Sequence, residues 1–265
     1  MAQEARVQKI LIAVPTTGGL MKAKTAESLV NLVRVLTRGG IEADLRNIDN
    51  SDIVTVRNMY ANMLLESDRW DSLLFIDSDM QLLPRTVSKL IAFNAPVSAV
   101  ACTKRYIDLE KFGEAFREHG DMERARAASH RFNTLLTWNN RKGGQVRRKG
   151  GFCTVAAVGM AVCLIKKSAL QAMVDKEAVP RRTDVYEGVV KNSWGFFDFV
   201  QYSGMTLTED YSFCHRWTYG MGEPLWVCTD EIVGHIGDFA YSGNYQIDLD
   251  TFLEARKPAK VAKEA

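Results

Sequence analysis

The sequence predicts an α/β protein whose central, mostly parallel sheet is covered by helices on both faces. Short apolar runs alternate with stretches of helical periodicity through the first hundred residues, as in 9-KILIAVP-15 followed by residues 22–38. Hydrophobic residues make up 46% of the 265 residues and charged residues 25%, which is ordinary for a globular protein with a sizeable core. No apolar run approaches the roughly 18–20 residues that span a bilayer. The formal net charge of +2 indicates no particular partner.

Each expected element of the first half follows from its local pattern. Apolar residues recur at helical spacing through 22–38, and the glycine pair 39-GG-40 ends that helix. Asn50 or Ser51 is expected to cap the next helix. The expected order is a strand at 9–15, a helix at 22–38, a strand at 41–48, a helix with Ile53, Val56, Tyr60, Met63 and Leu64 on its apolar side, a strand at 71–77, a helix opened by Pro84 and a strand at 96–102.

The second half has a less regular pattern. Residues 107–150 are rich in charge, with a helix expected within 111–136 and a basic turn or hairpin at 139-NNRKGGQVRRKGG-151. This basic segment is either a solvated, mobile loop, a flap over a phosphate-bearing ligand, or a contact to an acidic acceptor. Residues 152–167 read as a strand with a central glycine, and 168–174 as a short helix. No linker is long enough to separate two domains.

The strand 71-DSLLFID-77 ends on two acids separated by one serine. Asp77 and Asp79 repel each other, and burial raises that cost. A hard divalent cation such as Mg²⁺ or Mn²⁺, which prefers oxygen ligands, would offset the repulsion. D-x-D pairs occur by chance in many loops, but this pair lies at the carboxyl end of a strand, where such sheets bind ligands. The loop at 16–19 and 103-TKRY-106 are expected at the same edge.

Two later clusters carry polar side chains that have both structural and chemical interpretations. Glu209 and Asp210 in 206-TLTEDYSFCHRW-217 suit the first turn of a helix capped by Thr206 or Thr208, where acids are favourable. His235 in 233-VGHIGDF-239 is either a turn residue or a ligand with room for close approach to a metal or phosphate.

The five cysteines are widely spaced and form no C-x-x-C pair. Their surroundings are mostly apolar, so we expect buried, reduced thiols in a cytoplasmic protein. The spacing argues against a zinc site. Cytoplasm is the expected location, with the inner membrane surface as the alternative.

Four motifs in one order resemble glycosyltransferases of the GT-A fold, most closely the family-two-like group with its small bacterial and phage members. They are a strand ending in DSD, the upstream pair Arg57-Asn58 in VRNMYANMLL, the acids of TEDYSFCHRW, and the GH pair after the next strand. VGMAVCLIKKSAL is similar to a further segment of that family. The resemblance covers roughly residues 8–245. It implies one GT-A catalytic domain over 1–250, with 107–150 as a mobile insertion or flap and 251–265 as a polar tail.

The resemblance also implies a role for each matching residue. Asp77, Asp79 and His235 would hold a Mn²⁺ or Mg²⁺ ion that bridges the donor diphosphate. Asp210 would be the general base and Glu209 its assistant. The nucleotide-sugar would contact Pro15, Thr16, Thr17, Arg57, Asp77, Ser78 and Lys104, with Arg105 facing the phosphates or the acceptor.

The resemblance leaves the acceptor and the outcome open. The segment 215-HRWTYG-220 does not match the acceptor motif usual in the family. We expect an inverting transfer from a nucleoside-diphosphate sugar, with uridine diphosphate favoured, to a glycan or lipopolysaccharide, a lipid-linked sugar, a protein or modified phage-type DNA. The alternatives are a sugar nucleotidyltransferase, whose glycine-rich loop VPTTGGLMKAK matches poorly, and a non-catalytic GT-A domain that binds nucleotide-sugar.

Overall fold

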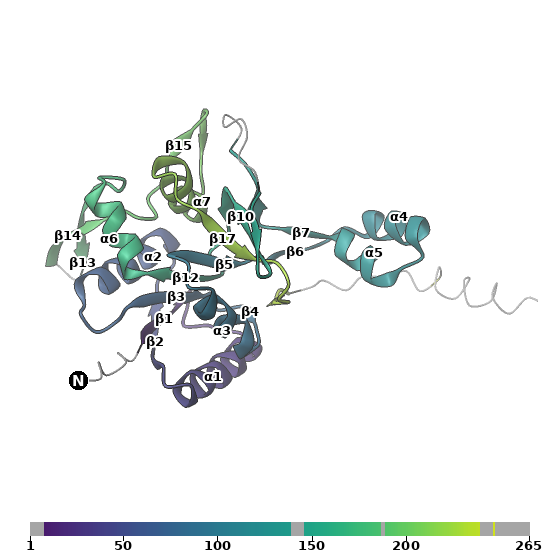
Figure 1. Cartoon of the computed structure of the whole chain (residues 1–265), viewed down its shortest axis with the longest axis horizontal. Helices are drawn as coiled ribbons and strands as arrows, with labels where there is room; N and C mark the ends of the chain where they lie inside the picture. The colour runs from purple at the N-terminus through teal and green to yellow at the C-terminus, as the bar shows by residue number, and fades with distance from the viewer. Residues whose placement is uncertain (1–7, 139–145, 187–188, 239–245, 247–265) are drawn as a thin grey trace, which may run out of the picture.

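The computed structural model describes residues 8–138, 146–186, 189–238 and 246. It has the predicted α/β class, with one large central sheet and helices around it (Figure 1). The strands of this sheet, in spatial order, are β2 (Glu42–Asp49), β1 (Lys9–Thr16), β3 (Ser72–Ile76), β12 (Val162–Lys166), β5 (Val97–Val100), β17 (Leu225–Cys228), β10 (Phe152–Val155) and β9 (Arg148–Lys149).

Most strands of the sheet run in one direction, as predicted. β1 pairs in parallel with β2 and with β3, and β17 pairs in parallel with β5. β12 and β10 run against their neighbours. The carboxyl ends of β1, β2, β3, β5 and β17 therefore meet at one edge of the sheet, and the site described below lies at that edge.

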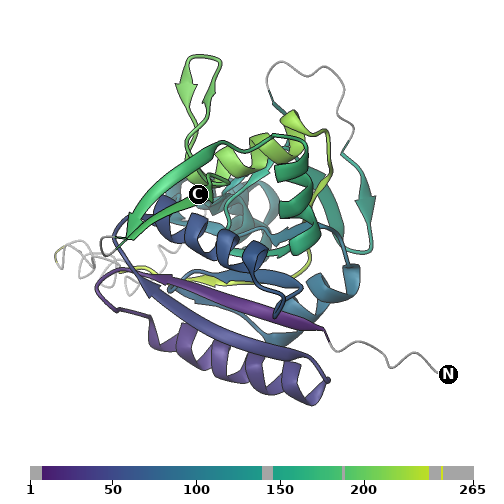
Figure 2. The ribbon, with the colours of Figure 1, turned by 90° about the vertical axis from the view of Figure 1, so that its left-hand side faces the viewer.

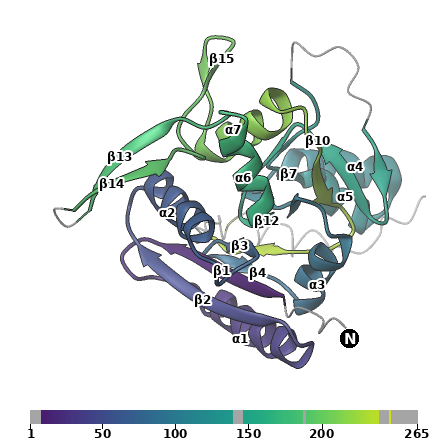
Figure 3. The same ribbon diagram turned by 60° about the vertical axis from the view of Figure 1, so that its left-hand side comes forward.

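Helices cover both faces of the sheet because the strand residues alternate between two cores. Leu11 and Ala13 of β1 face one core, whereas Ile10, Ile12 and Val14 face the other. Figure 3 shows α1 and α3 on one side and α2, α6 and α7 on the other, and Figure 2 shows α1 (purple) and α2 (blue) on opposite sides of β1 and β2. The helices are α1 (Ala23–Arg38), α2 (Ile53–Glu66), α3 (Pro84–Phe93), α6 (Lys167–Asp175) and α7 (Glu209–Cys214), which a π-helix at His215–Gly220 continues.

The residues between β5 and β10 in the sequence include an arm that projects from the body of the protein (Figure 1). Its stem is the antiparallel pair β6 (Thr103–Ile107) and β7 (His130–Phe132), and its tip is the helix pair α4 (Leu109–His119) and α5 (Met122–Ser129). The remaining short pairs are β4 (Met80–Gln81) with β18 (Gly234–His235), β8 (Thr134–Leu135) with β11 (Ala157–Val158), β13 (Arg181–Tyr186) with β14 (Val189–Trp194), and β15 (Gln201–Tyr202) with β16 (Met205–Thr206).

Two local predictions were wrong. The cap of α2 is Asp52, not Asn50 or Ser51: its side chain accepts hydrogen bonds from the Val54 amide at 3.0 Å and the Thr55 hydroxyl at 2.6 Å. Asn50 instead accepts a bond from the Asp52 amide. Residues 152–167 form β10, β11 and β12 in place of a single strand, because the chain turns at residues 159–161.

Several predictions concern residues in or near the arm and the chain end. The helix expected within 111–136 is the pair α4 and α5. Residues 139–145 of the basic segment and the tail at 251–265 lie outside the described residues, so the flap stays a prediction. All five cysteines are free thiols, and all but the half-buried Cys153 are buried. Within the described residues, no helix is both long and apolar enough to cross a membrane.

Candidate active site

A cavity of about 580 Å³ opens at the carboxyl ends of β1 and β3. This volume is in the range of small-molecule and nucleotide sites. Five residues predicted to bind nucleotide line it: Pro15, Thr16, Thr17, Asp77 and Ser78. The remaining lining residues are Leu20, Met21, Lys22, Asn50, Ile53, Asp79 and Arg105. The predicted carboxylates and the predicted nucleotide loop thus border one cavity.

Arg57 joins carboxylates that are distant in the sequence. Its side chain is only 2% exposed, and its Nη2 atom lies 3.2 Å from the Asp77 carboxylate. Its Nε atom lies 3.3 Å from Asp210 and 3.6 Å from Glu209, both in the first turn of α7. Burial alone lowers the pKa of the guanidinium, but Asp77, Asp210 and Glu209 outweigh burial and raise it. Arg57 therefore stays charged and binds three carboxylates at the edge of the sheet where the carboxyl ends of the parallel strands meet.

Asp210 is poised to exchange a proton near neutral pH. Burial raises the pKa of its carboxyl to about 7, against the opposing effect of Arg57, and the charges of Glu209 and Asp77 add to the rise. Its side chain is 14% exposed, and its buried Oδ1 atom is the one that faces Arg57. A base whose pKa is close to the working pH combines a useful ionised fraction with a useful affinity for the proton.

Asp79 lines the cavity and lies between a histidine and an arginine. Its Oδ2 atom is 3.3 Å from His235 Nε2 and 3.3 Å from Arg105 Nη1. Burial raises the pKa of the Asp79 carboxyl, but His235 and Arg105 outweigh burial and lower it. The pKa of His235 rises, chiefly through its bond to Asp79. Asp79 is therefore an ionised carboxylate that attracts a positive charge.

The tautomer of His235 follows from its other contact. Nδ1 lies 2.7 Å from the carbonyl oxygen of Thr103, which only accepts hydrogen bonds, so Nδ1 carries a proton. In a neutral ring, Nε2 then presents a bare lone pair to the Asp79 carboxylate. Two lone pairs at this separation repel unless a proton or a cation lies between them. This donor set, an imidazole nitrogen opposite a carboxylate oxygen, fits a divalent cation.

The three predicted metal ligands are not equally close to one another. Among the residues that the structure describes, no three His, Cys, Asp or Glu side chains are gathered tightly enough to form a metal site by themselves. Asp77 is paired with Arg57, whereas Asp79 and His235 face each other. Mg²⁺ and Mn²⁺ commonly take several ligands from water and phosphate, so a two-residue core is compatible with such a cation.

Polar residues at the carboxyl end of β2 hold the end of β1 and the loop that follows it. The Thr16 hydroxyl accepts a hydrogen bond from the Asn47 side-chain amide at 3.0 Å, and Asp49 lies within 3.4 Å of the same hydroxyl. The Thr17 hydroxyl donates to the carbonyl of Asn50 at 3.5 Å. Asn47 and Asp49 were not among the predicted residues, although both lie at the end of β2, the strand that pairs in parallel with β1.

Asn58 explains why the Arg57-Asn58 pair occurs together on α2. It is buried, its amide donates to Asp198 at 2.9 Å, and its oxygen accepts from the amide of Phe197 at 2.9 Å. Asn58 therefore connects α2 to residues 197–198, while Arg57 binds the acids at the start of α7. Lys104 is exposed on β6 and is not among the lining residues, so its predicted nucleotide contact stays a prediction.

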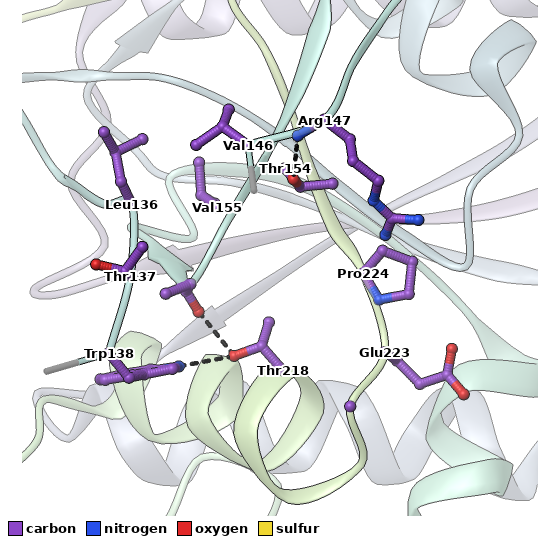
Figure 4. Close-up of a pocket in the computed structure, with 12 residues that line it drawn as sticks. Leu136, Thr137, Trp138, Val146, Arg147, Thr154, Val155, Thr218, Glu223 and Pro224 are labelled. Atoms are coloured by element: carbon purple, nitrogen blue, oxygen red, sulfur yellow. Dashed lines mark hydrogen bonds between the residues drawn. The ribbon is translucent and has the colours of Figure 1, made fainter. Parts of the chain in front are cut away.

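A second, smaller cavity of about 260 Å³ lies between the 136–138 segment, β10 and the π-helix (Figure 4). Its floor is the buried Trp138, whose indole nitrogen donates to the Thr218 hydroxyl at 2.9 Å. That hydroxyl lies 2.9 Å from the Ala156 carbonyl. None of the predicted catalytic, nucleotide-binding or metal-binding residues lines this cavity, but Val146 and Arg147 of the basic segment 139–151 do.

No protein-family description and no curated protein matches the sequence. Among solved structures, A197 from STIV aligns at a TM-score of 0.46 with 13% identity, over 87% of each chain. A Drosophila β-1,4-galactosyltransferase 7 variant, in complex with manganese, UDP-Gal and xylobiose, aligns at 0.43 with 13% identity, over 97% of this chain and 82% of that one. The inositol-1-phosphate CTP transferase from T. maritima aligns at 0.38 with 9% identity, over 96% and 98%. Similarity at these scores assigns no function to this chain.

Proposed function

We propose that this protein is a GT-A, family-two-like glycosyltransferase that depends on a divalent cation and moves a sugar from a nucleoside-diphosphate donor to an acceptor hydroxyl. One observation carries the proposal. A cavity of nucleotide size is bordered by Asp77 and Asp79, and Arg57 connects Asp77 to the acids of α7. The proposed cation ligand Asp79 lines this cavity, and the proposed proton acceptor Asp210 is connected to the lining residue Asp77 through Arg57.

The cation would be held by Asp79 and His235, with Asp77 contributing directly or through water. Among the lining side chains, Lys22 and Arg105 are positive and Asp77 and Asp79 are negative, so their formal charges cancel. A diphosphate therefore needs additional positive charge to bind well. When bound, Mn²⁺ or Mg²⁺ supplies that charge and stabilises the diphosphate as it leaves.

The transfer needs one proton acceptor. The hydroxyl oxygen of the sugar-accepting molecule forms a bond to the anomeric carbon of the donor. The bond from that carbon to the diphosphate breaks, and its electron pair leaves with the diphosphate. The acceptor proton passes to the Asp210 carboxylate, while Arg57 limits the repulsion between Asp210 and its neighbour Glu209. Direct displacement of this kind inverts the anomeric centre.

The nucleoside would pack on Pro15, Thr16 and Thr17, with uridine favoured as the base. A glycan or lipopolysaccharide, a lipid-linked sugar, a protein or modified DNA would supply the acceptor hydroxyl. The basic pair Arg147 and Arg148 lies at the β9 edge, where the Arg147 guanidinium is 5.4 Å from the Trp226 ring centre. This edge offers positive charge to an anionic acceptor.

Ligand-induced thermal stabilisation tests the proposal directly. Uridine and guanosine diphosphates are added, each with and without Mn²⁺, to wild type, to Asp79→Ala and to the distant surface variant Glu42→Ala. Binding to the folded state raises the melting temperature by mass action. We expect a Mn²⁺-dependent rise with one nucleotide in wild type and Glu42→Ala, and none in Asp79→Ala. The absence of any rise in folded wild type would refute the proposal.

A further inference from the structure

The two basic side chains that line the donor cavity are both paired with carboxylates. Lys22 Nζ lies 2.8 Å from Asp238 Oδ1, and Arg105 Nη1 lies 3.3 Å from Asp79 Oδ2. These residues come from the loop before α1, from β6, from the turn after β3 and from the segment after β18. Each cation that faces the cavity is thus neutralised by the protein itself.

The backbone brings these charges together. The Lys22 amide donates to the carbonyl of Ser78 at 2.9 Å, which anchors Lys22 beside the Asp77–Asp79 turn. Gly237 lets the Arg105 stem pass, because a Cβ atom there would lie 2.8 Å from Arg105 Cδ. Asp238, the next residue, has a pKa lowered first by Lys22 and, more weakly, by Arg105. Asp238 therefore lies in the field of both cations.

The pairs are easy to exchange. The Lys22 side chain is 41% exposed and that of Asp238 is 96% exposed, and Arg105 is 57% exposed. An ion pair this exposed to water changes an equilibrium constant by no more than about fivefold. A diphosphate bearing two or more charges attracts a cation more strongly than a single carboxylate does. Neither pair is strong enough to resist such a ligand.

We propose that Asp238 and Asp79 pair with the phosphate-binding cations Lys22 and Arg105 until a donor binds, and that the donor then replaces these two carboxylates. This exchange rests on the proposed function. When the donor binds, Asp79 pairs with the divalent cation, and Lys22 and Arg105 pair with the diphosphate. Asp238 then loses its partner. It competes with the donor for Lys22 and sets the affinity of the site for nucleotide.

Isothermal titration of uridine diphosphate in the presence of Mn²⁺ tests the role of Asp238, with guanosine diphosphate used if it is the nucleotide that stabilises wild type. We expect Asp238→Asn to bind about two- to fivefold more tightly than wild type, because a competing ion pair is lost. We expect Lys22→Met to bind roughly tenfold more weakly, because a charge-assisted contact is lost. In the double variant, Asp238→Asn should bring no gain over Lys22→Met alone.

Glu42→Gln is the matched control. Its Lys9–Glu42 pair has similar exposure, 40% and 63%, but lies at the opposite end of β1, so its loss should leave the affinity unchanged. Wild type that binds nucleotide with no gain in Asp238→Asn, or with an equal gain in the Lys22→Met background, would overturn this inference alone. Wild type that binds neither nucleotide would overturn the proposed function as well.

The ion pair between Arg105 and Asp79 allows an independent test of the exchange. Without nucleotide, Arg105→Gln should bind Mn²⁺ more tightly than wild type, because Asp79 is released from its partner. The same variant should bind the nucleoside diphosphate more weakly. Opposite changes in the two affinities support the exchange, whereas loss of both would mean that Arg105 only shapes the site.

Discussion

At the scale of single residues, the environment of Asp210 determines how the proposed reaction depends on pH. A base acts only as the carboxylate, and burial raises the pKa of this carboxyl to about 7. The ionised fraction therefore grows as the pH rises through 7. An unperturbed aspartate, with a pKa near 3.8, would be fully ionised throughout this range.

We predict that transfer, or the slow hydrolysis of the donor without acceptor, increases about tenfold per pH unit below 7 and levels off above it. With Mn²⁺ saturating at every pH, so that protonation of His235 does not limit the rate, Asp210→Asn should lower the rate by about 10²–10⁴-fold and remove this pH dependence. Glu209→Gln is the variant matched to Asp210→Asn, because it replaces the neighbouring acid in the same helical turn by its amide and leaves Asp210 in place. Initial rates of nucleoside diphosphate release between pH 5.5 and 8.5 measure both effects. Full activity in Asp210→Asn would exclude Asp210 as the base.

At the scale of elements, local patterns predicted the strands and helices that local residues specify. The alternation in β1 and the helical spacing in α1 and α2 are visible in the sequence because each pattern spans consecutive residues. The break in 152–167 is different, since it depends on a residue far away. The amide of Gly159 donates to the carbonyl of Asn133 at 2.9 Å, which draws the chain out of the sheet.

Gly159 is required because the Asn133 side chain occupies the space next to it. A Cβ atom at residue 159 would overlap the Asn133 side-chain amide and lie 3.2 Å from its Cγ. We predict that Gly159→Ala lowers the free energy of unfolding by about 1–3 kcal/mol, the usual cost of overpacking. Urea denaturation of Gly159→Ala, Asn133→Ala and the double variant measures it, and the double variant should be more stable than the sum of the single effects.

Gly113→Ala in α4 is the control for this prediction. A Cβ atom there would meet only the Arg117 side chain, at 3.6 Å, which is an ordinary contact. An alanine inside an exposed helix should therefore stabilise the protein by about 0.5–1 kcal/mol. If Gly159→Ala did not lower the free energy of unfolding, the contact with Asn133 would not explain the break between β11 and β12.

At the scale of the whole molecule, the candidate site combines residues that the sequence separates widely. Asp77, Asp79, Glu209, Asp210 and His235 could be proposed as site residues from the sequence because each lies in one of its four motifs. Lys22 and Asp238 could not, because 216 residues separate them and neither belongs to a motif. Their pairing exists only once the β1 loop and the segment after β18 reach the same edge of the sheet.

The described structure also separates into a rigid body and a weakly buried arm. The strand β3 is buried along its whole length, whereas α4 has no buried residue and α5 buries only Ala125 and Ser129. Local stability follows burial, so the arm should open without unfolding the sheet. We predict that amides of α4 exchange with deuterium at least about a hundredfold faster than those of β3.

Hydrogen-exchange mass spectrometry, with and without the nucleoside diphosphate and Mn²⁺, tests this division. Added ligand should slow exchange at residues 15–22 and 77–81, which line the donor cavity, and at 234–238, which contacts the lining residues Lys22 and Asp79. It should leave α4 unchanged. Residues 9–13 at the start of β1 are an internal reference, since global opening governs their exchange. If α4 exchanged as slowly as β3 in the absence of ligand, the arm would have to be covered in solution. If its exchange slowed on ligand addition, the arm would have to respond to the donor site through Thr103 and Arg105 at its stem.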